Sequence, residues 1–251
     1  MIYFGIPLRS AQVSNDWCMV SKLFNRTLWS VYNQTCSEFK VIIACHEIPM
    51  LEKKYDDRVE FIQVEAPVPR NKHEMMIDKG QKIHSIAMRI RRYGGGYTMM
   101  VDADDIQSCR IAAYVKEHKD ENGFVSKNGY YYHVGDNYVK MGHKFPNGSS
   151  TIVNYSIEDL PDRYYSIPTP NENTNPHICR KRHGDIPKFC TALGRELSTL
   201  PFIASIYVRD TGDNHSLMGT HESVFRILEQ SLMPKKYISD ELRQEFSIDW
   251  M

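Results

Sequence analysis

Three carboxylates, Asp102, Asp104 and Asp105, lie within four consecutive residues directly after the apolar run Tyr97–Val101. The run has the length of a strand that is buried on both faces, and the glycine triplet 94–96 ends whatever element precedes it. Ligands of α/β sheets bind at the carboxyl ends of the strands. Three neighbouring acidic groups repel one another there, and a hard divalent cation with a phosphate would relieve the repulsion. The spacing therefore predicts a metal and phosphate site at the tip of a buried strand.

The same residues also fit a plainer structure. Asp is a good N-cap residue, so an Asp-rich turn could simply precede the helix that we expect over 111–118. For an isolated Asp-x-Asp this would be the better interpretation. The buried strand before the cluster, the glycine triplet and the helix after it favour the ligand site instead.

The segment Asp102-Ala103-Asp104-Asp105 at the end of such a strand resembles the metal-binding motif of GT-A fold glycosyltransferases, especially the family-2-like enzymes. The likeness covers roughly residues 1–110. A short segment around His215 also resembles bacterial rhamnosyltransferase-like sequences. The resemblance implies a metal-dependent transfer of a sugar from a UDP- or dTDP-sugar donor to a glycan or lipid-linked glycan acceptor, in polysaccharide biosynthesis. The implied cofactor is Mn²⁺ or Mg²⁺.

The resemblance also implies roles for the residues of the motif. Asp104 is the first choice as metal ligand, and Asp102 binds the ribose or the metal through water. Ala103 lies with them in the nucleotide site, and Asp105 supports the other carboxylates. Because the cluster offers only hard oxygen donors, a soft metal is disfavoured.

Two further roles fall beyond residue 110, where the resemblance carries fewer motifs. Many GT-A enzymes add a late histidine to the metal, which points to His215. An inverting enzyme needs a carboxylate that removes the proton of the acceptor hydroxyl, and Asp185 is the candidate for this catalytic base. The weaker candidates are His183 and His221 for the metal, and Glu158 and Asp159 for the base.

Additional contacts to the nucleotide are expected near the ends of other elements. Pro7 and Arg9 stand at the end of a strand expected over 2–8, and Glu47 follows a strand expected over 39–45. The stiff basic loop 67–72 then leads into a helix over 74–93, where Lys79 and Lys82 are the candidates for contact with the diphosphate. The three arginines near the end of that helix are better explained as a solvated face.

The order of elements predicts an α/β fold of the GT-A, Rossmann-like kind, with a mixed, mostly parallel sheet flanked by helices. Segments 124–134 and 138–144 are expected to pair as antiparallel strands around Gly135, which gives a small antiparallel part on the acceptor side. Their tyrosines suit either sugar stacking or a half-buried sheet, with equal weight. Other expected strands span 59–64 and 202–208, and other expected helices span 17–32 and 222–230.

We expect a single glycosyltransferase domain over residues 1–230, followed by a helical tail over 231–251. Within the domain, residues 1–110 form the nucleotide-sugar half and residues 111–230 the acceptor half.

Composition sets the limits of these interpretations. The chain has 251 residues, 41% of them hydrophobic, and 31 Lys and Arg balance 31 Asp and Glu, so no net charge points to nucleic acid. The six cysteines show no C-x-x-C spacing, which argues against a zinc or redox site and favours a reducing cytoplasm. No run approaches the roughly 20 apolar residues of a membrane span, so only peripheral membrane association stays open.

Three rival functions share parts of this pattern. A nucleotidyltransferase that makes the sugar nucleotide usually has a Gly-rich basic loop after the first strand, and residues 5–10 do not supply one. A phosphohydrolase with an Asp-x-Asp nucleophile usually carries that motif after its first strand, whereas three expected strands precede it here. A non-catalytic scaffold that binds nucleotide or glycan would keep the carboxylates and lack turnover.

Overall fold

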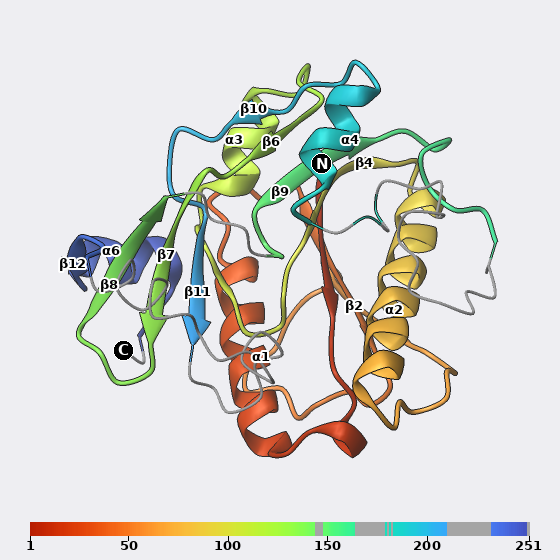
Figure 1. The fold of residues 1–251 in the computed structure, drawn as a ribbon, viewed down its shortest axis with the longest axis horizontal. Helices are drawn as coiled ribbons and strands as arrows, with labels where there is room; N and C mark the ends of the chain where they lie inside the picture. The colour runs from red at the N-terminus through yellow and green to blue at the C-terminus, as the bar shows by residue number, and fades with distance from the viewer. Residues whose placement is uncertain (144–147, 164–178, 180, 182, 210–231, 250–251) are drawn as a thin grey trace.

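The computed structural model describes residues 1–143, 148–163, 179, 181, 183–209 and 232–249. These residues form two β-sheets and the helices that cover them (Figure 1). The first sheet has the order β10-β6-β9-β4-β1-β2-β3. Four of its strands, parallel to one another, are β1 (Ile2–Pro7), β2 (Phe39–Cys45), β3 (Val59–Gln63) and β4 (Gly96–Met100).

The other three strands of this sheet come from later in the chain. β9 (Thr151–Tyr155) pairs antiparallel with both β4 and β6 (Gly123–Val125), and β10 (Ser198–Thr199) is parallel to β6. The prediction of a mixed, mostly parallel sheet flanked by helices is therefore confirmed. Because β6, β9 and β10 all follow residue 110, the two halves expected from the sequence share one sheet.

Helices cover both faces of the first sheet. On one face lie α1 (Trp17–Tyr32) and α3 (Ile111–Glu117), and on the other lie α2 (Lys72–Arg92) and α4 (Ile186–Ala192). α1 begins where expected, because the Asp16 carboxylate accepts a hydrogen bond from the Met19 N–H at 3.0 Å. α2 is capped in the same way by Asn71, whose side chain accepts from the Glu74 N–H at 2.9 Å.

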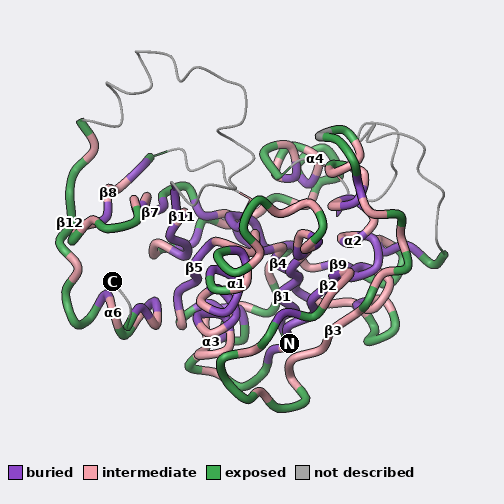
Figure 2. The backbone as a smooth tube through the Cα atoms, turned by 90° about the horizontal axis from the view of Figure 1, so that it is seen from below, coloured by how far each residue is buried: buried purple, intermediate pink, exposed green. Residues whose placement is uncertain are grey.

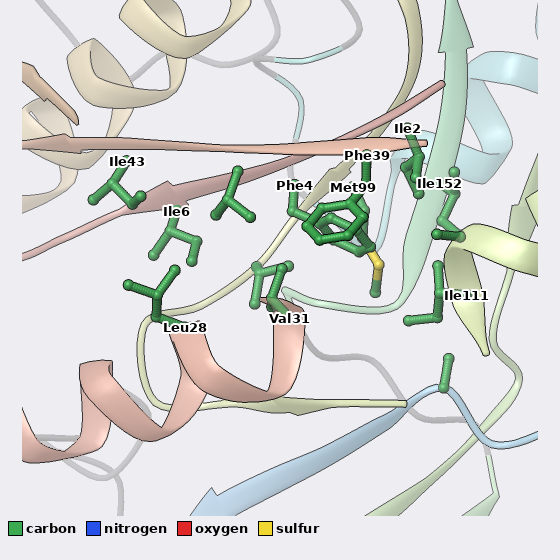
Figure 3. Packing of buried hydrophobic residues seen from close by; sticks show 14 of the residues in the cluster. Ile2, Phe4, Ile6, Leu28, Val31, Phe39, Ile43, Met99, Ile111 and Ile152 are labelled. Atoms are coloured by element: carbon green, nitrogen blue, oxygen red, sulfur yellow. The ribbon is translucent and has the colours of Figure 1, made fainter. Parts of the chain in front are cut away.

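The main core lies between α1 and the first sheet (Figure 3). Alternate residues of β1 point to opposite faces, so Phe4 packs beneath α1 while Tyr3 packs toward α2. Phe4, Leu28 and Phe39 are fully buried, and each such side chain contributes about 1.5–3 kcal/mol through its removal from water. Figure 2 shows that buried residues follow the strands of this sheet. The sheet is therefore a rigid platform for the loops at its edge.

The second sheet has the order β12-β8-β7-β11-β5. Its strands are β5 (Ile106–Gln107), β7 (Asn128–His133), β8 (Tyr138–His143), β11 (Ser205–Arg209) and β12 (Lys235–Tyr237). β7 and β8 pair antiparallel, as expected, and α6 (Asp240–Phe246) packs on one face of the sheet. A small 3₁₀ helix, η1 (Ala11–Val13), follows β1.

Three expectations need correction. Segment 124–134 is not one strand, because β6 and β7 belong to different sheets. The two strands are separated at Ser126, whose hydroxyl donates to the Asn128 carbonyl at 2.7 Å. β9 is an additional strand that the sequence interpretation did not include. The tail begins with strand β12 before it becomes helical at α6. The helix expected over 222–230 lies outside the described residues.

Among the described helices, none is both long and apolar enough to span a membrane.

Candidate functional site

The carboxylate cluster lies where the sequence predicted it, directly after β4 in the middle of the first sheet. The Val101 N–H still donates to the Gly5 carbonyl at 2.8 Å, so the sheet ladder holds the chain up to the residue before Asp102. The Asp105 N–H then donates to the Asp102 carbonyl at 3.1 Å and closes a turn. The chain leaves this turn as β5, the first strand of the second sheet. The carboxylates therefore stand at the junction of the two sheets.

Ser149 fixes the backbone and one carboxylate of the cluster. Its Oγ accepts from the Asp102 N–H at 2.9 Å and donates to Asp105 Oδ2 at 2.7 Å. Ser149 and Asp105 are both fully buried. Gly148 lies against the Asp102 carboxylate so closely that a Cβ atom at residue 148 would overlap it. This loop therefore seals one side of the cluster.

The cluster concentrates negative charge. Lys79 Nζ donates to Asp102 Oδ1 at 2.6 Å, and the pKa of Lys79 is raised because the nearby carboxylates outweigh the effect of burial. Burial and then the charge of Asp102 raise the pKa of Asp104 to about 6, while Lys79 and Arg9 oppose the rise. Burial, followed by the charges of Asp104 and Asp102, raises the pKa of Asp105 well above its usual value. The site therefore favours an additional positive charge.

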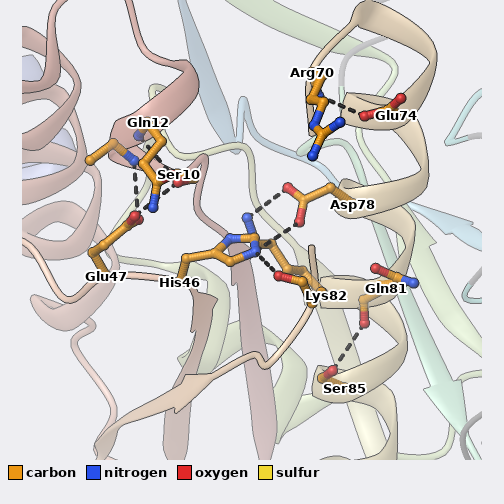
Figure 4. Close-up of polar contacts among 12 residues, drawn as sticks. Ser10, Gln12, His46, Glu47, Arg70, Glu74, Asp78, Gln81, Lys82 and Ser85 are labelled. Atoms are coloured by element: carbon orange, nitrogen blue, oxygen red, sulfur yellow. Dashed lines mark hydrogen bonds and ion pairs between the residues drawn. The ribbon is translucent and has the colours of Figure 1, made fainter. Parts of the chain in front are cut away.

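A second polar group stiffens the loops next to this site. The Ser10 hydroxyl and the Ala11 N–H both donate to the Glu47 carboxylate, at 2.9 and 3.1 Å, which ties η1 to the end of β2 (Figure 4). Glu47, which the sequence predicted as a nucleotide contact, is thus bonded to the loop after β1.

Asp78 and Lys82, both on α2, form a buried ion pair, and the half-buried His46, which directly follows β2, lies next to it (Figure 4). Lys82 is 1% exposed and its Nζ donates to Asp78 Oδ2 at 2.7 Å. His46 Nε2 lies 3.7 Å from Asp78 Oδ1 and 3.0 Å from the Ala66 carbonyl oxygen. Lys82 therefore faces Asp78 in the interior, whereas Lys79, one turn earlier, faces the carboxylate cluster.

A pocket of about 800 Å³ opens between η1, the β3–α2 loop and the start of α2. Two prolines, Pro67 and Pro69, stiffen the loop, and Arg70 and Glu74 supply charges of both signs. The remaining lining residues are Gln12, Val13, Val68 and Met75. The pocket thus lies beside the carboxyl ends of β1 and β3 and beside the same helix that carries Lys79.

The described residues contain no set of three or more His, Cys, Asp or Glu side chains arranged to hold a metal ion on their own. A site for Mg²⁺ needs fewer protein ligands, because this ion is commonly bound by one or two carboxylates together with phosphate oxygens and water. Asp102 and Asp104 are both half-buried rather than sealed, as such a shared site requires. The donor set therefore fits a metal that arrives with a phosphate ligand.

The other predicted site residues separate into three groups. Pro7 ends β1 and Ala103 lies within the turn of the cluster, so both stand at the same edge. His215 lies outside the described residues. Asp185 is the N-cap of α4, which packs on Tyr155 opposite the first residue of β4. The structure therefore places Asp185 toward the amino end of β4 and does not bring it to the carboxylates.

Sequence reasoning missed the residues that hold the cluster. Ser149 and Gly148 belong to a run of small residues, 147–151, that precedes an apolar strand, and this pattern is the one signal that marked them. No local sequence pattern predicted that Asp78 and Lys82 are buried, because an Asp and a Lys four residues apart on a helix usually form an exposed pair.

No protein-family model matches the sequence, and no curated protein matches it. Among solved structures, the chain is similar to the crystal structure of S. aureus TarS, with a TM-score of 0.47 and 14% sequence identity. The match covers 82% of this chain and 36% of the TarS chain, so the chain spans little more than a third of that protein. Similarity at this level establishes neither a family nor an activity.

Proposed function

We propose that the chain is a metal-dependent glycosyltransferase that takes a sugar from a uridine or deoxythymidine diphosphate donor and passes it to a glycan. The observation that carries this proposal is the group of three carboxylates at the carboxyl end of β4, on a central strand of a mostly parallel sheet. Ligands of such sheets bind at this edge. The resemblance of Asp102-Ala103-Asp104-Asp105 to the GT-A motif indicates that the reaction is metal-dependent sugar transfer.

Asp104 and Asp102 would hold Mn²⁺ or Mg²⁺, and the diphosphate would complete the coordination. When bound, such an ion stabilises the negative charge that grows on the leaving diphosphate. Lys79 already lies within 2.6 Å of Asp102 and supplies a second positive charge beside the phosphate position. Asp105 is buried against Ser149, so its role is to hold the turn.

The nucleoside would occupy the pocket between η1 and the start of α2. This pocket and the carboxylates share the edge at which β1, β2 and β4 end, and Lys79 and the pocket residue Met75 lie one turn apart on α2. Two prolines in the wall reduce the entropy lost when a ligand orders the loop. In the reaction, the acceptor oxygen attacks the anomeric carbon, the bond from that carbon to the diphosphate breaks, and a base removes the hydroxyl proton.

Thermal unfolding with a panel of nucleoside diphosphates, each with and without Mn²⁺, tests the proposal. A ligand that binds only the native state at a hundredfold excess over Kd stabilises it by about 2.7 kcal/mol. We expect one diphosphate to stabilise the protein only with metal. Asp104→Ala should lose this effect and keep its fold, whereas Asp57→Ala, at an exposed turn residue, should retain it.

Two results would contradict the proposal. One is a wild-type protein that no nucleoside diphosphate stabilises with Mn²⁺. The other is an Asp104→Ala protein that responds as the wild type does. A metal-dependent response to nucleoside triphosphates alone would point to the nucleotidyltransferase, and binding without any sugar transfer would point to the scaffold.

A further inference from the structure

One face of the second sheet combines tyrosine rings with basic side chains. Tyr131 on β7 and Tyr207 on β11 are neighbours in the parallel register, and their rings meet nearly at right angles with centroids 5.9 Å apart. The guanidinium of Arg209 lies 5.6 Å from the Tyr131 ring centroid and 5.9 Å from that of Tyr207. Both distances are within the range of cation–π attraction.

The pattern continues across β8 and β12. Lys140 is paired with Tyr131 on one side and with Lys235 on the other, so all three side chains leave the same face of the sheet. The ammonium of Lys235 lies 4.2 Å from the Tyr138 ring centroid. We call this surface the aromatic-basic face; its members are Tyr131, Tyr138, Lys140, Tyr207 and Lys235. Arg209 is only 6% exposed and packs against the rings of Tyr131 and Tyr207 rather than facing solvent.

The opposite face of the same sheet is an ordinary hydrophobic core. Tyr130, Val139 and Ile206 pack there against Phe246 of α6. Alternation along each strand therefore places mostly apolar side chains under α6, and Lys140, Lys235 and half-buried tyrosines on the other side.

The aromatic-basic face starts at the carboxylate cluster. Ser205, Tyr207 and Arg209 alternate along β11 and therefore share one face. The Ser205 hydroxyl donates to the Ser149 carbonyl at 2.6 Å, and Ser149 is the residue that bonds Asp105. From Ser205 to Arg209 the strand covers about 13 Å, at about 3.3 Å per residue. The half-buried Tyr207 of the aromatic-basic face therefore lies two residues along β11 from the contact that holds the proposed transfer site.

We propose that the aromatic-basic face binds an anionic glycan, which would be the acceptor; this identification rests on the proposed function. Tyrosine rings offer flat apolar surface for sugar rings, and the accessible lysines, Lys140 and Lys235, pair with carboxylate or phosphate groups along the glycan. A glycan fits better than a nucleic acid, since the protein has no net positive charge and the aromatic-basic face lies next to the proposed site of sugar transfer.

Binding of polysaccharides to the full chain, measured without nucleotide or metal, tests the proposal. Polygalacturonate and phosphomannan carry carboxylate and phosphate groups, and fully methyl-esterified pectin and neutral mannan are their uncharged counterparts. We expect at least one anionic polymer to bind more than tenfold tighter than its neutral counterpart. The preferred polymer then separates carboxylate from phosphate recognition.

Neighbouring lysines on β12 provide a matched pair of variants. Lys235 belongs to the aromatic-basic face, whereas Lys236 points to the other side, where its Nζ donates to Tyr130 Oη at 3.2 Å; both are exposed. The double variant Lys140→Gln/Lys235→Gln should weaken binding of the anionic polymer about tenfold. Each exposed pair of opposite charges contributes up to about a factor of five in affinity, and this variant removes two such pairs. Lys236→Gln should leave it unchanged.

Three outcomes would overturn the proposal: neutral polymers that bind as tightly as anionic ones, equal losses in both sets of variants, or a single-stranded oligonucleotide that binds tighter than either glycan. Because no donor is present, these outcomes are separate from the nucleotide test. If nucleotides do not bind but the glycan does, the proposed transferase function is ruled out, and the aromatic-basic face is still a glycan site.

Discussion

Asp104→Asn should stabilise the metal-free protein while it removes the response to metal and nucleotide. Burial and the charge of Asp102 raise the pKa of Asp104 from its usual 3.8 to about 6. At 1.36 kcal/mol for each pKa unit, this difference corresponds to about 3 kcal/mol of unfavourable interaction in the charged form. Because the side chain is only half-buried, water screens part of it, and we expect a gain of about 1–3 kcal/mol.

The sign and the pH window of this gain follow from proton linkage. The folded state holds the Asp104 proton more tightly than the unfolded state, so the penalty is absent below about pH 4, where both states are protonated. It grows between about pH 4 and pH 6 and is complete above that range, so stability is lost as the pH rises. Asparagine carries no charge, and its advantage over aspartate should follow the same curve.

Urea unfolding in the presence of a chelator, at pH values from 4 to 8, measures this effect. The control is Asp57→Asn, which removes an equal charge from an exposed turn and should change stability by less than about 0.5 kcal/mol. Adding Mn²⁺ and the nucleoside diphosphate should then reverse the order and make the wild type more stable. A gain for Asp104→Asn that is equal at pH 4 and pH 8, or no gain at all, would refute the electrostatic explanation.

Two further substitutions test the surroundings of the site. Lys82→Met should lower the free energy of unfolding in urea by about 3–5 kcal/mol, because it leaves the buried Asp78 carboxylate without its ammonium partner. Adding Asp78→Asn should recover most of this loss, and a double variant as unstable as the single one would contradict the explanation. Gly148→Ala should keep the fold, since loop residue 148 has an ordinary backbone angle, but weaken metal-dependent nucleotide binding at least tenfold by displacing the Asp102 carboxylate. Titration of the nucleotide with Mn²⁺ by calorimetry measures the change, and unaltered affinity would show that the carboxylate does not take part.

Local sequence patterns were sufficient for the parts of the fold that depend on neighbours in the chain. The range 17–32 was predicted as a helix because apolar residues recur at helical spacing behind an Asp cap, and α1 has these bounds. The position of the carboxylates followed in the same way from one apolar run that stops abruptly. Both signals lie within a few residues of the feature that they mark.

The missing parts depend on contacts between distant residues. Ser149 bonds Asp105 although 44 positions separate the two residues in the chain, and no local sequence pattern links residues that far apart. Segment 124–134 was expected to be a strand because aromatic and β-branched residues occupy both of its ends, yet the strand stops before Ser126 and the two ends join different sheets. Lys82 was expected to contact a ligand, and only the position of His46 and Asp78 shows why it is buried instead.

The cluster contains one carboxylate that is fixed in the interior and two that are accessible to a ligand. Asp105 is fully buried and accepts the Ser149 hydroxyl, so it cannot turn toward a ligand without losing that bond. Asp102 and Asp104 remain half-buried at the mouth of the same turn. Burial and the charge of Asp102 raise the pKa of Asp104, so a cation beside these two carboxylates would favour their ionised forms. Ser149 also joins this turn to Ser205 of β11, and so connects the carboxylates to the strand that carries Tyr207 of the aromatic-basic face.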